Sequence, residues 1–191
     1  MKRINDVWCV PDGDELITRK ILESRKPNSD PTHIDLYYER RVREAALSRV
    51  TNFGTFVDAG ANVGIWSRPM SSLFKKVEAF EPAEKNRECL LINLGDIDNV
   101  EIFHHGLGDS NCEGNLYLGV KNCGDCKIVY RDSIKGVPFT DEAIETIKKH
   151  KPVIVFEIDQ DKDQCCEILE SLGAERVTVA SKCLMIYAFK E

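Results

Sequence analysis

Two carboxylates, Asp58 and Glu81, follow apolar segments at a spacing that suits the binding of a nucleoside. Residues 56–64 read FVDAGANVG, an apolar run that enters a turn of small residues, and residues 76–82 read KVEAFEP. Open α/β sheets bind their ligands at the carboxyl ends of the strands. An acidic residue roughly 20 positions beyond a glycine-rich strand–helix turn accepts hydrogen bonds from ribose hydroxyls. The pair therefore predicts a nucleoside site.

The glycine spacing distinguishes between kinds of nucleoside. Gly60 and Gly64 permit a tight turn and a close approach of the backbone to a ligand. Their Gly-x-x-x-Gly spacing differs from the Gly-x-Gly-x-x-Gly that holds a dinucleotide pyrophosphate. Asp58 beside the turn would repel phosphates and suits a cationic methionine group. We therefore expect a sulfonium nucleoside here. The alternative is a tight turn of an α/β protein that binds no ligand.

Composition limits the classes of function. The chain has 191 residues, 42% hydrophobic and 30% charged, with a formal net charge of −6. This charge argues against a protein that relies on phosphate neutralisation, so we expect no nucleic-acid partner. No apolar run approaches the roughly 18 residues of a membrane span, and the N-terminus lacks a secretory pattern. The sequence thus predicts a cytoplasmic protein with no membrane partner.

The cysteines do not form a metal-binding pattern. Eight are present, at positions 9, 89, 112, 123, 126, 165, 166 and 183. Cys123 and Cys126 form a lone Cys-x-x-Cys, whereas a structural zinc site usually needs a second ligand pair. His104 and His105 are adjacent on an expected strand and would point to opposite faces. We expect reduced thiols and no metal, and the redox sensitivity of Cys123 and Cys126 is left open.

The elements that must position the carboxylates alternate along the chain. Residues 1–34 look like an N-terminal cover, and a helix is expected over about 35–50, so we place an N-terminal segment at 1–50 and one compact domain at 51–191. Strands are expected at 55–59, 77–80, 100–104, 127–131, 153–158, 176–180 and 183–189, with a short extended segment at 115–120. Helices are expected at 62–74, 83–94, 140–150 and 161–172.

This alternation indicates an α/β protein with a doubly wound, mostly parallel sheet covered by helices on both faces. The last two expected strands are different. Only Ser181 and Lys182 separate them, and two residues cannot form a parallel crossover. The sequence therefore predicts a final hairpin with an antiparallel last strand.

The two strand-end motifs, with NVEI at 99–102 before GLGD at 106–109 and the run 145–157, resemble the FkbM-like family of class I S-adenosylmethionine-dependent methyltransferases. The resemblance covers roughly residues 50–160 and implies a seven-stranded sheet with an antiparallel last strand. It implies S-adenosyl-L-methionine as cofactor and O-methylation of a hydroxyl on a sugar, glycan or other small molecule. The residues that it implies for cofactor binding are Asp58, Gly60, Asn62, Val63, Gly64, Glu81, Pro82, Gly106 and Leu107.

The fourth-strand region departs from the family. Family members carry an Ile-Asp-Val-Glu-Gly-like motif there, whereas residues 128–136 read IVYRDSIKG. Asp132 corresponds to the aspartate of the family motif, whereas the glutamate of that motif has no clear counterpart in this chain. A hydroxyl acceptor benefits from a general base, for which we consider Asp132 and Glu157. Two alternatives stay open: a cofactor-binding protein with altered or lost catalysis, and a nucleotide- or NAD-binding protein.

Overall fold

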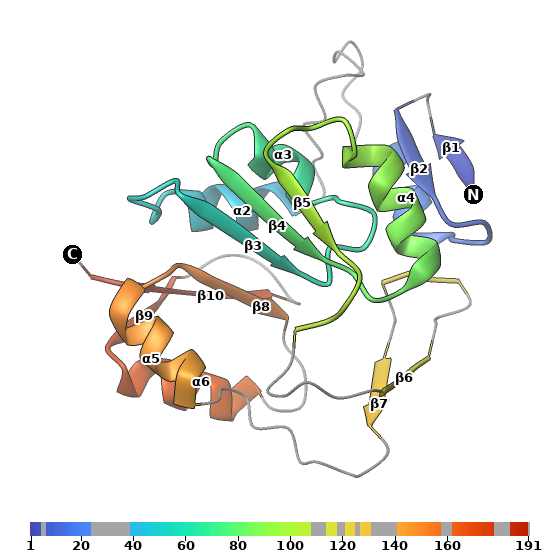
Figure 1. Cartoon of the computed structure of the whole chain (residues 1–191). Helices are drawn as coiled ribbons and strands as arrows, with labels where there is room; N and C mark the ends of the chain where they lie inside the picture. The colour runs from blue at the N-terminus through green and yellow to red at the C-terminus, as the bar shows by residue number, and fades with distance from the viewer. Residues whose placement is uncertain are drawn as a thin grey trace. The chain divides into compact units, whose positions relative to one another are not determined.

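The computed structural model describes residues 1–4, 7–23, 39–107, 114–117, 121–124, 127–130, 141–157, 162–177 and 184–190. The chain divides into two units (Figure 1). The first unit comprises residues 1–38 and 53–133, and the second comprises 39–52 and 134–191. The predicted domain boundary at residue 50 stays a prediction.

A parallel sheet of three strands forms the centre of the first unit. Its strands, in spatial order, are β3 (Thr55–Ala59), β4 (Lys76–Phe80) and β5 (Val100–Phe103). Ala59 pairs with Phe80, and Phe80 pairs with Phe103, so all three strands end at one edge. The predicted strands are confirmed here to within one residue at each end. Their carboxyl edge carries the residues singled out above.

Two helices connect these strands. Helix α4 (Glu84–Leu94) follows β4 as predicted, and its Leu90 and Leu94 pack with Ala61 and Ala79 in a buried cluster. Helix α3 (Ser67–Ser71) begins five residues later than predicted. The prediction was wrong because residues 60–64 include three positive φ angles, which an α-helix cannot contain. The first helical residues expected from the sequence are therefore part of a turn.

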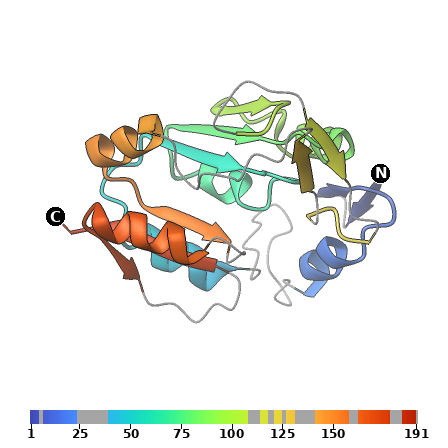
Figure 2. The same cartoon turned by 90° about the horizontal axis from the view of Figure 1, so that it is seen from below.

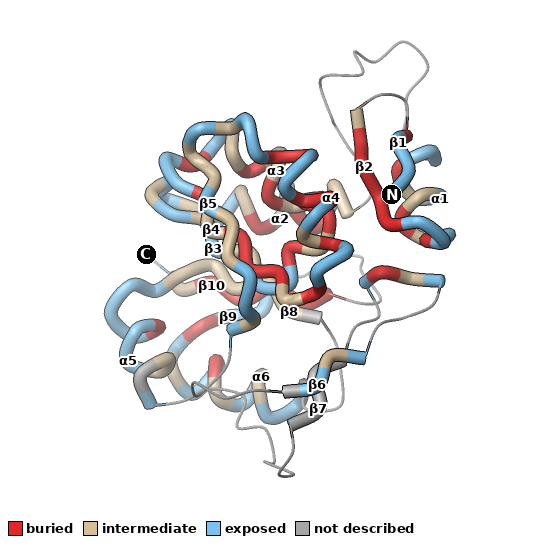
Figure 3. Tube along the Cα trace, turned by 45° about the vertical axis from the view of Figure 1, so that its right-hand side comes forward, coloured by how far each residue is buried: buried red, intermediate tan, exposed pale blue. Residues whose placement is uncertain are grey.

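The N-terminal residues add their own core to the first unit. They form the antiparallel strands β1 (Lys2–Ile4) and β2 (Trp8–Val10), and then helix α1 (Leu16–Glu23). Figure 2 shows α1 beside these two strands. All three residues of β2 are buried, as Figure 3 shows in red. They pack with Val63, Ile65 and Cys89, so this segment is part of the hydrophobic core.

The second unit contains an antiparallel sheet of three strands. β10 (Leu184–Phe189) lies between β8 (Ile154–Glu157) and β9 (Ala174–Val177) and is antiparallel to both. The antiparallel pairing expected for the last two strands is thus present. The described part of this unit also contains the helices α2 (Arg40–Leu47), α5 (Asp141–His150) and α6 (Lys162–Ser171). The hydrophobic core of this unit includes Ile147, Leu169 and Tyr187, which pack in one buried cluster.

The pairing of β7 (Lys127–Tyr130) differs from the prediction. It was expected as a fourth strand of the parallel core, but it pairs antiparallel with β6 (Gly114–Tyr117). Among the described residues, the ladders form two three-stranded and two two-stranded sheets. The α/β class is therefore observed, whereas the continuous seven-stranded sheet stays a prediction.

Candidate functional site

The candidate site lies at the carboxyl edge of the parallel sheet. The turn after β3 is hydrogen-bonded to the end of β4. The backbone N–H groups of Gly60 and Ala61 both donate to the carbonyl of Phe80, at 2.9 and 3.0 Å. Gly60, Asn62 and Gly64 have φ angles of 83°, 53° and 94°. Asparagine and glycine tolerate this left-handed region better than other residues. The sequence therefore folds into a tight turn instead of continuing directly into a helix.

Glu81 is held against this turn. Its Oε2 accepts the backbone N–H of Asn62 at 2.8 Å, and its Oε1 accepts that of Ala83 at 2.8 Å. The residue is only 4% exposed. Burial raises the pKa of Glu81, and the bonds from Ala83 and Asn62 partly oppose this shift. The structure thus brings together the glycine-rich turn and the carboxylate that the sequence predicts to act with it.

Asp58 is the second predicted carboxylate and is half-buried in β3. Its Oδ2 accepts the hydroxyl of Ser67 at 2.5 Å. Ser67 is the first residue of α3 and is fully buried. The contact joins the end of the first strand to the helix beyond the turn, which fixes the turn from its other side.

The two glycines of the turn have different surroundings. A Cβ at Gly60 would meet nothing within 4 Å, which indicates open space above this part of the turn. A Cβ at Gly64 would lie 2.9 Å from Cδ1 of Leu94 and 3.0 Å from Cδ1 of Leu90. A glycine is therefore needed at position 64 for packing, because α4 lies against it. The space that a ligand could use adjoins Gly60.

The side chains that follow Asn62 face the core. Val63 is fully buried, and its carbonyl accepts the side-chain amide of Asn93 at 2.8 Å. Ile65 is buried, and Trp66 packs against the same N-terminal cluster. The predicted role of Val63 in cofactor binding stays a prediction. Any such role would have to involve its backbone, since its side chain is enclosed.

Three further residues are connected to Glu81 directly or through hydrogen-bonded neighbours: Asn86, Cys123 and Asp14. The carbonyl of Cys123 accepts Nδ2 of Asn86 at 2.8 Å, and its thiol donates to Oδ1 of Asn62 at 3.0 Å. Its backbone N–H donates to Oδ2 of Asp14 at 2.7 Å. Cys123 is therefore bonded to Asn62, which contacts Glu81, and to Asn86, which lowers the pKa of Glu81 through a side-chain hydrogen bond.

Only one of the contacts of the Asp14 side chain can be predicted from the local sequence. Asp14 precedes α1 and accepts the N–H of Thr18 at 3.0 Å, a capping role that its position before a helix allows one to predict. Its bond to Cys123 spans 109 positions and leaves no local pattern. Cys126, the partner of Cys123 in the Cys-x-x-Cys motif, lies outside the described residues.

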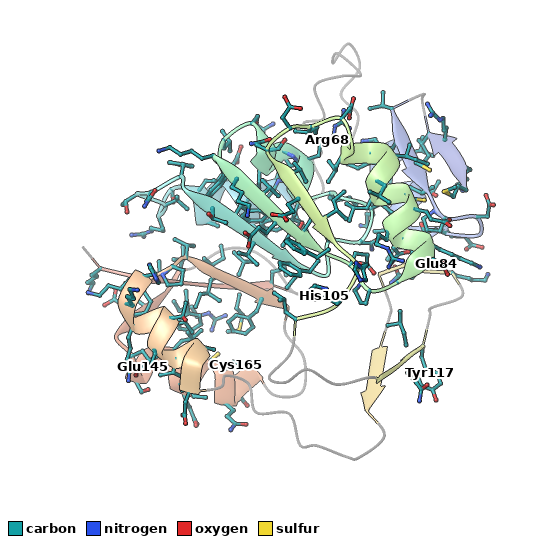
Figure 4. The ribbon with its side chains drawn as sticks, viewed as in Figure 1. Arg68, Glu84, His105, Tyr117, Glu145 and Cys165 are labelled. Atoms are coloured by element: carbon teal, nitrogen blue, oxygen red, sulfur yellow. The ribbon has the colours of Figure 1, made fainter. Side chains whose placement is uncertain are left out.

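Aromatic rings lie beside the third strand's end. Phe80 stacks on Phe103 with centroids 4.5 Å apart, and His105 contacts both rings edge-on at 5.5 and 5.8 Å. Figure 4 shows His105 just beyond β5. The strand ends at Phe103, so His104 and His105 are not on a strand as expected, and both are exposed. These rings form one side of the edge that carries Glu81.

The loop predicted to contact adenine follows directly. Gly106 is half-buried and Leu107 is 52% exposed. Pro82, also predicted to contact the cofactor, is half-buried between Glu81 and α4. An exposed leucine and half-buried neighbours are accessible to a ligand, but their assignment to adenine and ribose stays a prediction.

The side chains of the two predicted catalytic residues, Asp132 and Glu157, are not among those that the structure describes. Asp132 lies outside the described residues. Glu157 is the last residue of β8, where its backbone pairs with Leu184 in the second unit, and its side chain is not described. Both roles stay predictions.

The described residues provide neither a metal-binding cluster nor a membrane-spanning helix. Among the described residues, no group of three or more His, Cys, Asp or Glu side chains could hold a metal ion. Within the same part of the chain, each helix is too short or too polar to cross a bilayer.

Comparison with known proteins supports the fold. No protein-family model and no curated protein sequence matches the chain. Among solved structures, a precorrin-6y C5,15-methyltransferase from Geobacter metallireducens GS-15 aligns with a TM-score of 0.51 and 16% identity, covering 90% of this chain and 96% of that one. The chain thus has a methyltransferase-like α/β fold.

Two further structures align less well. One is an rRNA methylase from Streptococcus thermophilus, with a TM-score of 0.48, 19% identity, and coverage of 87% of this chain and 100% of that one. The other is a ribosomal protein L11 methylase from Lactobacillus delbrueckii subsp. bulgaricus, with a TM-score of 0.48, 12% identity, and coverage of 86% and 92%. These similarities are too weak to bear on the acceptor.

Proposed function

We propose that the chain is an S-adenosylmethionine-dependent methyltransferase whose cofactor binds at the turn after β3. The observation that carries the proposal is the bond from the Asn62 N–H to Glu81, which joins the glycine-rich turn to the acidic end of the next strand. This juxtaposition of turn and carboxylate is what recognition of a ribose beside a phosphate-free group requires. The methyltransferase-like fold is consistent with it.

The residues present fit such a cofactor in two respects. The open space beside Gly60 can take a group close to the backbone. The Glu81 carboxylate accepts backbone bonds from Asn62 and Ala83 and a side-chain bond from Asn86, and a carboxylate has about four lone-pair sites, so capacity remains for a ribose hydroxyl. Because Glu81 is nearly buried, a ribose must share or displace contacts around it. The bonds of Asn62 and Asn86 to Cys123 are the nearest candidates.

The proposed roles divide along the sheet edge. Glu81, with Pro82 beside it, binds the ribose hydroxyls. Asp58, through its charge, favours the cationic methionine end near Gly60. The segment Gly106–Leu107 contacts the adenine. The cofactor supplies an electrophilic methyl group, and the protein's task is to hold donor and acceptor in line.

The proposed acceptor is a hydroxyl of a sugar, glycan or other small molecule, as the family resemblance implies. Asp132 or Glu157 would act as the base that takes the hydroxyl proton. The reaction is proposed to need no metal. The net charge of −6 favours such an acceptor over one held through many phosphates, and RNA is included in the test as a competing acceptor.

The cofactor is tested by isothermal titration calorimetry with S-adenosylmethionine, S-adenosylhomocysteine and NAD. Binding of either methionine nucleoside, with no response to NAD, is the expected result. Tight binding of NAD with no response to the other two would contradict the proposal and favour a dinucleotide-binding protein.

A second candidate is a methyltransferase-like protein that binds the cofactor without turning it over. The departure of residues 128–136 from the family motif favours it. The two candidates differ in whether S-adenosylhomocysteine is produced when glycans, small hydroxylated molecules and RNA are offered. Production with a hydroxylated acceptor supports the enzyme. Cofactor binding without product across the panel supports the second candidate.

A further inference from the structure

Two buried thiols from distant parts of the chain meet inside the first unit. Cys9 in β2 and Cys89 in α4 are 80 positions apart, and their sulfur atoms are 3.5 Å apart. They are 3% and 0% exposed, and both are free thiols. No role in the proposed methyl transfer involves this pair.

The backbone around Cys9 is already fixed to the helix that carries Cys89. Asn93, one helical turn after Cys89, accepts the Cys9 N–H at 2.7 Å and donates to the Cys9 carbonyl at 2.9 Å. A disulfide needs a sulfur separation of about 2.05 Å, so the thiols must close by about 1.5 Å. Asn93 already holds the backbone of Cys9 against α4, so rotation of the two cysteine side chains is the movement that this closure calls for.

One of the two cysteines borders a pocket that a small oxidant could enter. Cys9 lines a pocket of about 360 Å³ together with Arg3, Trp8, Arg68 and Ile92. Cys89 does not line it. Burial and the hydrogen bond with Cys9 raise the pKa of the Cys89 thiol to about 12, which keeps it protonated at neutral pH. The two cysteines therefore differ in their surroundings: Cys9 lines the pocket, whereas Cys89 is fully buried and does not.

We propose that Cys9 and Cys89 form a peroxide-oxidisable pair, in which Cys9 reacts first and Cys89 resolves it to an intramolecular disulfide. The Cys9 sulfur attacks a peroxide oxygen, the O–O bond breaks, and a sulfenic acid and one water result. The Cys89 sulfur then attacks the Cys9 sulfur as the Cys89 proton passes to the Cys9 hydroxyl, which leaves as a second water. Two thiols lose two electrons in total, and one peroxide gains them.

The bridge would fasten the N-terminal strands to α4. It would close a loop of about 80 residues, which restricts the unfolded chain more than the folded one. For a chain of this length, we expect the melting temperature to rise by about 10 °C on oxidation and to return when a reductant is added.

The test treats the folded full-length protein with hydrogen peroxide and maps its peptides by mass spectrometry without reduction. The expected product is a cross-linked peptide pair containing Cys9 and Cys89, lighter by two hydrogen atoms than the two free peptides. Cys89→Ser should instead accumulate oxidised Cys9. Cys165→Ser, on α6 in the other unit, is the matched control and should still form the bridge.

Three outcomes would overturn the proposal. Cys9 and Cys89 could both remain thiols while the folded protein is oxidised elsewhere. Cys9 could proceed to sulfinic acid in the wild type without forming the bridge. The bridge could form without raising the melting temperature, which would refute the proposed fastening of β2 to α4.

Discussion

At the residue scale, the site is determined by how Glu81 and the glycines are enclosed. The sequence located Glu81 at a strand end, and the structure adds that it is 4% exposed and bonded to two backbone N–H groups. Gly60 and Gly64 look equivalent in the sequence, yet one adjoins open space and the other α4. Such differences depend on contacts from distant elements, which local spacing does not encode.

The raised pKa of Glu81 predicts a pH dependence of stability. Folding raises this pKa above the unfolded value of about 4.3, so the folded state holds the proton more tightly. The contribution of Glu81 to the free energy of unfolding is thus greatest below the unfolded pKa and falls as pH rises through the folded pKa. Urea unfolding of wild type and Glu81→Gln from acidic to neutral pH measures it. The difference in unfolding free energy between wild type and Glu81→Gln should change between the unfolded and the folded pKa of Glu81. Parallel curves across this pH range would refute the predicted pH dependence.

The two glycines predict separable effects. Gly64→Ala places a Cβ at a positive φ against Leu90 and Leu94, and we expect a loss of about 2–4 kcal/mol of unfolding free energy. Gly60→Ala incurs backbone strain alone, about 1–2 kcal/mol. If the cofactor occupies the space beside Gly60, Gly60→Ala should weaken S-adenosylhomocysteine binding more than Gly64→Ala does. Chemical denaturation and calorimetry check both rankings, and a reversed order in either would contradict the account.

At the element scale, β3, β4, β5 and α4 were predictable because each is a local pattern with clear ends. The start of α3 was not, since the left-handed turn at residues 60–64 resembles a helix start in sequence. The pairing of β7 with β6 was missed because strand partners are not a local property. The N-terminal segment was interpreted as a cover, whereas its β2 is bonded to α4 through Asn93.

Asn93 predicts a large loss of stability on truncation. Its fully buried side chain accepts the Cys9 N–H and donates to the carbonyls of Cys9 and Val63. Asn93→Ala leaves these buried groups without their partner, and we expect a loss of about 2–4 kcal/mol. Asn52→Ala, at an exposed position, is the control and should change stability by less than about 0.5 kcal/mol. Equal effects in urea denaturation would refute the role of Asn93.

At the scale of the whole molecule, the cofactor residues and the predicted base Glu157 belong to different units. The carboxyl ends of β3, β4 and β5 all belong to the first unit. The proposed cofactor binding can therefore be tested independently of the acceptor and of the base. It depends chiefly on Glu81.

The decisive measurement is calorimetric titration of S-adenosylhomocysteine into wild type, Glu81→Ala and Glu84→Ala. Glu84, an exposed acid three residues further on, is the matched control for loss of charge. Loss of charge-assisted bonds to the ribose should cost about 1.5–3 kcal/mol, so the Kd of Glu81→Ala should rise by about 10- to 150-fold while Glu84→Ala stays near wild type. Circular dichroism would establish that both variants are folded. A folded Glu81→Ala that binds as tightly as wild type, or a wild type that does not bind, would contradict the proposed site.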